Sequence, residues 1–201
     1  QCGAAAGTGP RAGRQACLMR LLVLSDLHVE HAPFAAPDIG YDRVVLAGDI
    51  HNGVAALEWA RTTFAHVPIL QIAGNHEFYD HDYDRCLAAM RERARQLDID
   101  FLENESRVFD GVEFFGCTLW TDFRVFEQPG RAHRMTADQA MLANRQLIAD
   151  YHAIERIEAG CSRRFAPQDA RQLFDRSLAW LEPALRAPAR LPRVVVSHHL
   201  P

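Results

Sequence analysis

Short runs of apolar residues, each followed by polar or turn-forming residues, recur along the first hundred positions. Three of these runs span 21–24, 44–47 and 68–73. Continuous apolar runs of this length are typical of strands that are buried on both faces of a parallel sheet. Apolar side chains recur at helical spacing over 54–64, between the second and third runs, and again over about 82–97. The order strand, helix, strand, helix predicts an α/β fold.

The pattern becomes less regular beyond position 100. A turn signal at Asp110-Gly111 lies among shorter strand-like segments. These segments span 101–102, 107–109 and 112–118. Another apolar run at 193–196 predicts a last strand close to the end of the sequence.

Two helices are predicted between the short strands and the last strand. Thr136 and Gln139 form a capping-box pattern, which predicts a long helix that runs to about 158. Pro167 suits a first helical turn and predicts a second helix that ends near 185. We therefore divide the chain into an N-terminal extension at 1–18 and one domain at 19–201, with a helical insertion at about 136–185.

Length and composition limit the class of protein. A chain of 201 residues with 48% hydrophobic residues can bury the core of one domain. Its net charge of -4 and its lack of lysine argue against nucleic acid as a partner. No apolar run approaches the roughly 20 residues that a membrane-spanning helix needs, so no membrane partner is expected. Five widely spaced cysteines without a C-x-x-C pair argue against a disulfide scaffold and predict a cytoplasmic protein.

Polar side chains follow the apolar runs directly. In chain order these are Asp26 and His28, then Asp49, then Asn75 and His76, and finally His198 beside its neighbour His199. The carboxyl ends of parallel strands meet at one edge of a sheet, so these side chains are expected in one crevice. Carboxylate, amide and imidazole donors without thiolate suit divalent Mn, Fe, Zn, Ni or Co. Gly48 and Gly74, which end the second and third runs, would let the backbone approach the site closely.

Each of these motifs is weak when it is taken alone. Asp26-x-His28 fits a chance loop, and Gly48-Asp49 fits an ordinary turn after a strand. Gly74-Asn75-His76-Glu77 is more specific, although Asn75 also suits a helix cap. Four independent turns would have to place metal-binding residue types at strand ends in this order, so the motifs together favour a metal site.

The ordered set D-x-H, G-D, G-N-H-E and a late His resembles the calcineurin-like metallophosphoesterase family. The resemblance covers the chain from about Met19 to its end. It implies an α/β fold built as a two-sheet sandwich flanked by helices, with two divalent metal ions at the strand ends. The family's last signature, G-H-x-H, does not occur in the sequence, so the fold is expected to be incomplete at the C-terminus.

The resemblance also implies a role for each residue. Asp26 and His28 correspond to ligands of the first metal, and Asp49 to the carboxylate that bridges both metals. Asn75 and His198 correspond to ligands of the second metal, with His199 as the rival to His198. His76 corresponds to the residue that contacts the phosphate and protonates the leaving oxygen, so His76 and Asp49 are the expected catalytic residues.

Two departures argue against the phosphoprotein phosphatase branch of that family. The branch has an Asp three residues after the bridging Asp, where this chain has Asn52. It also has an Arg just before G-N-H-E, where Ile72-Ala73 stand here. Both departures argue against a phosphoprotein as the substrate. A small substrate is expected because nothing in the sequence marks a large basic groove.

The expected function is a dimetal-dependent hydrolase of phosphomonoesters or phosphodiesters, which acts through a metal-bridging hydroxide on a small or nucleotide-like substrate. A degenerate fold that serves as a binding scaffold without catalysis is the alternative, and a nuclease ranks lower. The aromatic side chains of an irregular segment are expected to pack locally, and a lid or a base-stacking surface is the less favoured alternative. These residues are Trp120, Phe123 and Phe126. The sequence does not identify the metals, the ester or the oligomeric state.

Overall fold

The first sheet of the protein is parallel and carries the predicted strands in chain order. The computed structural model describes residues 18–127 and 135–200, so most of the predicted extension at 1–18 lies outside it. The strand order is β1-β2-β3-β4, with every neighbouring pair parallel. The strands are β1 (Leu21–Leu24), β2 (Arg43–Ala47), β3 (Ile69–Ile72) and β4 (Asp100–Phe101).

Strand β2 shows why the apolar runs are continuous. Val44 and Leu46 belong to one hydrophobic core cluster, whereas Val45 and Ala47 belong to a second one. Because alternate side chains of a strand point to opposite faces, β2 contributes to a core on each side of the sheet. The continuous pattern therefore reflects a strand that is buried on both faces.

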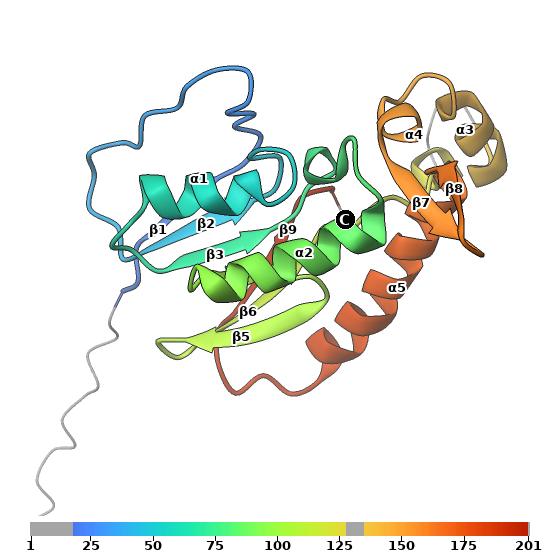
Figure 1. The fold of residues 1–201 in the computed structure, drawn as a ribbon. Coiled ribbons are helices and arrows are strands. Elements are labelled where there is room, and N and C mark those ends of the chain that lie inside the picture. Colours follow the sequence, from blue (N-terminus) through green and yellow to red (C-terminus); the bar gives the residue numbers. More distant parts are fainter. Residues whose placement is uncertain (1–17, 128–134, 201) are drawn as a thin grey trace, which may run out of the picture.

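Two helices cover one face of this sheet (Figure 1). They are α1 (Ala55–Thr63) and α2 (Tyr83–Gln96). The Asp82 side chain accepts a hydrogen bond of 2.9 Å from the backbone nitrogen of Arg85, so α2 begins with a side-chain cap. Leu57 on α1 and Met90 on α2 are fully buried in the first core cluster, as their helical spacing predicts.

The other face of the first sheet packs on a second, mixed sheet. The order of this sheet is β5-β6-β9, with β5 and β6 antiparallel and β6 and β9 parallel. Its strands are β5 (Glu105–Phe109), β6 (Val112–Cys117) and β9 (Arg193–Ser197). Phe114 and Val196 meet Leu70 and Ile72 in the core between the sheets. The predicted two-sheet α/β sandwich is confirmed.

Helix α5 (Pro167–Arg186) lies against the second sheet. The rings of Trp180 on α5 and Phe115 on β6 have their centroids 6.0 Å apart. Pro167 occupies the first helical turn, as predicted. None of the helices in the described residues is long and apolar enough to cross a membrane.

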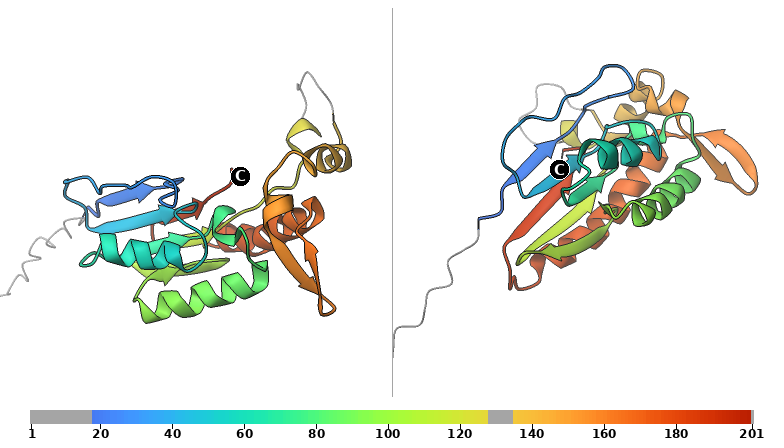
Figure 2. Two further views of the ribbon diagram at one scale, coloured as in Figure 1. Left: turned by 45° about the horizontal axis from the view of Figure 1, so that its top comes forward. Right: turned by 60° about the vertical axis from the view of Figure 1, so that its left-hand side comes forward.

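The long helix predicted from Thr136 to about 158 is wrong. The capping box at Thr136 does form, but the helix that it opens, α3 (Ala137–Asn144), is short. The rest of the segment forms α4 (Asp150–Ala153) and a hairpin of β7 (Glu155–Glu158) and β8 (Cys161–Arg164). Figure 2 shows the hairpin projecting from the sandwich in both views.

The turn of this hairpin explains the error. Ala159 and Gly160 have φ angles of 49° and 82°, which is the left-handed pair that a two-residue hairpin turn requires. Tertiary contacts then hold the hairpin in place. Asp169 on α5 accepts hydrogen bonds from Arg163 at 2.6 and 2.8 Å and from Arg156 at 3.3 Å. Burial acts to raise the pKa of Asp169, but these arginines outweigh it and lower the pKa, so the carboxylate stays ionised.

Candidate metal centre

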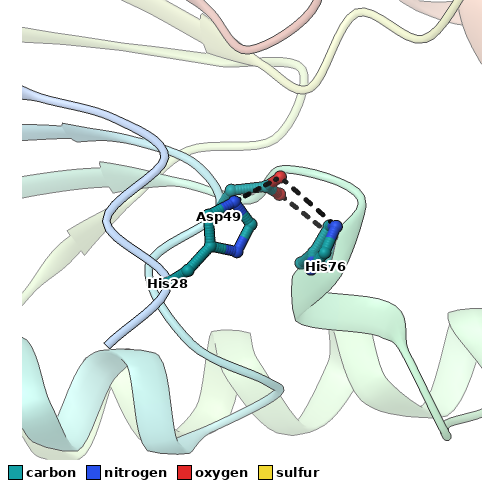
Figure 3. A group of neighbouring side chains, drawn as sticks. All are labelled: His28, Asp49 and His76. Atoms are coloured by element: carbon teal, nitrogen blue, oxygen red, sulfur yellow. Dashed lines mark hydrogen bonds and ion pairs between the residues drawn. The ribbon is translucent and has the colours of Figure 1, made fainter. Parts of the chain in front are cut away.

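Asp49 lies at the centre of a cluster of imidazoles at the carboxyl ends of the strands. Its side chain is almost fully buried on the turn that follows β2. Its Oδ2 atom lies 3.5 Å from Nε2 of His198, 3.7 Å from Nε2 of His28 and 4.0 Å from Nε2 of His76. Figure 3 shows His28 and His76 facing the Asp49 carboxylate, His28 from a loop and His76 from the start of a short 3-10 helix (His76–Phe78). Segments that lie up to 170 positions apart in the sequence therefore converge on one carboxylate.

The cluster contains two groups of potential metal ligands. One consists of His28, Asp49 and His76, and the other of Asp26, Asp49 and His198, with the ligand atoms of each group within 4.8 Å of one another. Asp49 belongs to both groups, as a bridging carboxylate would. In the structure, His28 shares a ligand group with His76. The family resemblance instead assigns His28 and Asp26 to the same metal ion.

Asn75 completes the convergence of the predicted residues. Its Oδ1 atom lies 3.2 Å from Nε2 of His198, so it borders the second ligand group. All six residues expected in the crevice are therefore neighbours in space. The role of each one in metal binding or catalysis stays a prediction.

Three residues of the cluster have left-handed backbone conformations. The φ angles are 54° at Asp26, 44° at His28 and 55° at Asp49. Each such conformation costs a residue with a Cβ atom about 1–2 kcal/mol. Backbone hydrogen bonds of 3.1 Å, from Asp26 N to Gly48 O and from His28 N to Asp49 O, hold the first two. Strain of this kind is concentrated at functional sites, and here it turns three ligand-type side chains toward one point.

Gly48 and Gly74 allow the turns after β2 and β3 to touch. A Cβ atom on Gly74 would lie 2.7 Å from the backbone nitrogen of Asp49. Gly48 has a φ angle of 90°, and a Cβ atom there would lie 2.6 Å from the backbone nitrogen of Gly74. At these glycines the backbones of the two turns therefore approach each other closely. This contact brings Asp49 beside Asn75 and His76.

The buried carboxylate of Asp49 attracts positive charge at the cluster. Burial acts to lower the pKa of His198, but the hydrogen bond and charge of Asp49 outweigh it and raise the pKa to about 9. Burial likewise acts to raise the pKa of Asp49, and His198 and the amide of His76 lower it below its usual range. Nδ1 of His198 lies 3.0 Å from the carbonyl oxygen of Ala47, which turns Nε2 toward Asp49. Histidine ligands of metals are commonly held by this kind of bond, so the residues present fit a divalent ion.

Comparison with known proteins identifies the family. A model of the calcineurin-like phosphoesterases matches residues 19–201. The chain belongs to the calcineurin-like phosphoesterase family. A search of curated proteins found no match.

One solved structure of similar fold is that of the phosphopantetheinyl hydrolase PptH from Mycobacterium tuberculosis. The two chains superpose with a TM-score of 0.63 at 18% sequence identity, and the match covers 92% of this chain and 70% of the other. At this identity the likeness shows the fold alone. It agrees with the two-sheet α/β architecture of a calcineurin-like phosphoesterase.

His198, and not His199, lies in the candidate ligand groups found in the described part of this calcineurin-like phosphoesterase. The His199 ring stacks on Trp120 with centroids 5.4 Å apart, and its Nδ1 lies 3.3 Å from the carbonyl oxygen of Thr118. Burial lowers the pKa of His199, in contrast to His198. His199 belongs to neither of the two ligand groups found in the described residues.

Glu77 is a site residue for which sequence reasoning gave no role. Its side chain is fully buried, and its Oε2 atom accepts hydrogen bonds from the backbone nitrogens of Asp49 at 2.9 Å and of Gly74 at 2.7 Å. Its Oε1 atom accepts a third from Ile50 at 2.9 Å. Burial raises the pKa of Glu77 to about 7, against the effect of these three donors. Glu77, the last residue of the G-N-H-E motif, therefore links the turns that carry Asp49 and His76 through hydrogen bonds to their backbone.

A mostly apolar pocket of about 280 Å³ lies beside the ligand cluster. It shares His199 and Asp150 with the surroundings of the cluster, and Trp120, Phe123, Ile148 and Tyr151 form much of its wall. Trp120 also packs in the core, 4.9 Å between ring centroids from Phe165. Local packing and a pocket wall are thus both observed for Trp120, whereas the side chain of Phe126 lies outside the described residues.

Proposed function

We propose that this protein is a divalent-metal-dependent hydrolase of small phosphate esters. One observation carries the proposal: in a calcineurin-like phosphoesterase, two groups of N and O ligands share the buried carboxylate of Asp49. We assign Asp26, His28, Asp49, Asn75 and His198 as the metal ligands. Divalent ions held there would neutralise the charge of a phosphate group and lower the pKa of a water molecule.

His76 is assigned to proton transfer. Its side chain is 27% exposed, whereas that of His198 is 8% exposed, so a substrate can reach His76 more readily. The ring of Tyr79 stacks on His76 with centroids 4.1 Å apart and planes inclined by 24°. This stacking fixes the plane of the imidazole, from which Nε2 can donate a proton to the leaving oxygen of the ester.

The pocket supports a small leaving group with apolar or aromatic character. Its volume of about 280 Å³ suits one ring or a short chain, and Phe123 and Ile148 offer apolar contacts. The name of the neighbour PptH makes phosphopantetheinyl esters one class to include among the substrates tested. A net charge of -4 without lysine argues against a nucleic-acid substrate.

Removal of divalent metal should abolish activity, and its return should restore it. We expect the chelated protein to hydrolyse neither aryl phosphate monoesters nor diesters. We expect it to regain activity with Mn, Fe, Zn, Ni or Co ions, because a divalent ion would neutralise the phosphate charge and lower the pKa of the attacking water. Initial rates on 4-nitrophenyl phosphate, bis(4-nitrophenyl) phosphate and a phosphopantetheinyl ester measure this. Manganese binding by calorimetry without turnover of any ester would favour the scaffold alternative instead.

Replacement of His76 by alanine should slow poor leaving groups more than good ones. An alkyl leaving oxygen needs a proton in the transition state, whereas 4-nitrophenolate does not, so we expect a loss of about a hundredfold for alkyl and about tenfold or less for nitrophenyl phosphates. A plot of log kcat/KM against leaving-group pKa for both proteins measures this. Parallel plots would contradict the assigned proton transfer.

A further inference from the structure

Asp150 reaches the metal centre from a segment that sequence reasoning treated as an insertion. It begins helix α4, and its side chain is almost fully buried. Its Oδ1 atom accepts a hydrogen bond of 2.8 Å from Nδ2 of Asn75 and another of 2.7 Å from the hydroxyl of Tyr79. Asp150 and Asn75 lie 75 positions apart in the sequence, so the contact is a product of the tertiary fold.

The bond to Asn75 determines which end of that amide faces the ligand cluster. An ionised carboxylate accepts hydrogen bonds and donates none, so Asp150 requires the NH₂ group of Asn75 on its side. The Oδ1 atom of Asn75 is thereby turned toward Nε2 of His198, at 3.2 Å. The amide oxygen is the atom that a metal ion can use, whereas the NH₂ group has no lone pair to offer it.

Through its bond to Tyr79, Asp150 also influences the orientation of the His76 ring. The Tyr79 hydroxyl donates to Asp150, and its ring stacks on the imidazole of His76. Asp150 therefore holds Asn75, a proposed metal ligand, directly. It holds His76, the proposed proton donor, through the ring of Tyr79. Within the described residues, its side chain makes no other hydrogen bond that would explain its burial.

We propose that Asp150 is a positioning residue, which orients Asn75 for metal binding and Tyr79 against His76. The inference rests on the proposed function in one respect, because it takes Asn75 to be a metal ligand. The segment from α3 to α4 thereby contributes to the metal centre, besides forming a wall of the neighbouring pocket.

The test compares variants that change the hydrogen bonds among Asp150, Asn75 and Tyr79. Asp150→Asn keeps the size of the side chain, but its amide can donate to Asn75 and so permits the reversed orientation. Asp150→Ala removes the acceptor without adding a donor. Tyr79→Phe removes the bond from the hydroxyl to Asp150 and the long bond of 3.4 Å that the hydroxyl accepts from Nδ2 of Asn75, but it leaves the bond between Asn75 and Asp150. Asp175→Asn, on the exposed side of α5, is the matched control. Each metal-free protein is titrated with Mn²⁺ by calorimetry. Its Tm is measured, as are its kcat and KM for 4-nitrophenyl phosphate and for an alkyl phosphate, whose leaving oxygen needs a proton.

We expect both Asp150 variants to bind Mn²⁺ about 10- to 100-fold more weakly, as is usual when a partner of a metal ligand is lost. Tyr79→Phe should keep its affinity for Mn²⁺ within about threefold, because Asp150 still holds Asn75. It should lose mainly kcat for the alkyl phosphate, because the ring that stacks on His76 is no longer held by its hydroxyl. A purely structural role would lower Tm and leave the Mn²⁺ affinity of the folded protein unchanged.

The outcomes separate the inference from the proposed function. If the wild-type protein binds Mn²⁺ and hydrolyses esters while neither Asp150 variant changes the affinity, the inference fails and the function stands. If the wild-type protein binds Mn²⁺ without hydrolysis and the variants bind it weakly, the inference stands and the function fails. Should the wild-type protein bind none of the divalent ions of Mn, Fe, Zn, Ni and Co, both fail.

Discussion

Asparagine in place of Asp49 should reduce phosphate ester hydrolysis by about a thousandfold or more while the fold survives. The Oδ2 atom of Asp49 is the point at which both ligand groups meet, 3.5 to 4.0 Å from three imidazoles. A neutral amide removes the negative charge that would lie between two cations. The Oδ1 atom of Asp49 accepts a hydrogen bond of 2.9 Å from the backbone nitrogen of His76, and an Asn oxygen can still accept it.

The measurement is kcat/KM for an aryl phosphate at saturating Mn²⁺, together with the Mn²⁺ affinity of the metal-free protein. Asp175→Asn on the exposed face of α5 has the same change of charge far from the cluster and should match the wild-type protein. Circular dichroism before the assay verifies that both variants are folded. If the activity of Asp49→Asn stayed within tenfold of that of the wild-type protein, the proposed role of Asp49 as a shared metal ligand would be contradicted.

The strands and the ligand cluster could be predicted from the sequence for the same physical reason. A strand such as β2 that contacts two cores shows no polar interruption, so its end is marked sharply by the first polar residues. In a parallel sheet those ends share one edge. Asp49 and His76 could therefore be brought together without knowledge of the tertiary contacts between their turns.

The hairpin of β7 and β8 could not be predicted in the same way. Its strand Glu155–Glu158 contains only one apolar residue, Ile157, and that residue is exposed. A strand that buries little has no clear alternation, and the capping box at Thr136 favoured a continued helix. The Ala159-Gly160 turn was the signal that was missed, and the pairing with Asp169 that stabilises the hairpin is not visible along the sequence.

Glu77 and Asp150 illustrate two further limits. Glu77 stood inside a recognised motif, but a residue that binds backbone nitrogens from two turns has no distinguishing residue pattern. Asp150 stood in a segment taken to be a continuous helix, where an acidic residue is ordinary on a solvated face. Both act by orienting other residues, and that kind of role depends on distances that only the folded chain fixes.

Loss of the Glu77 carboxylate is the second change for which we expect a large effect. Glu77→Ala leaves the backbone nitrogens of Asp49, Ile50 and Gly74 without their buried acceptor. An unsatisfied buried donor costs about 1–3 kcal/mol, so the free energy of unfolding should fall by about 4 kcal/mol. That is a large part of the total stability of a domain of this size. Glu77→Gln, which keeps one acceptor oxygen, should lose about half as much.

Urea unfolding of the metal-free proteins measures these differences. Glu182→Gln is the matched control, because Glu182 on α5 is 48% exposed and forms a surface ion pair with Arg186. Its free energy of unfolding should stay within about 0.5 kcal/mol of the wild-type value. The two Glu77 variants should also bind Mn²⁺ weakly at temperatures where they remain folded, since the turns that carry Asp49 and Asn75 lose their common brace. If Glu77→Ala were as stable as the control, water would have to replace the carboxylate, and Glu77 would not be the group that sets the distance between the two turns.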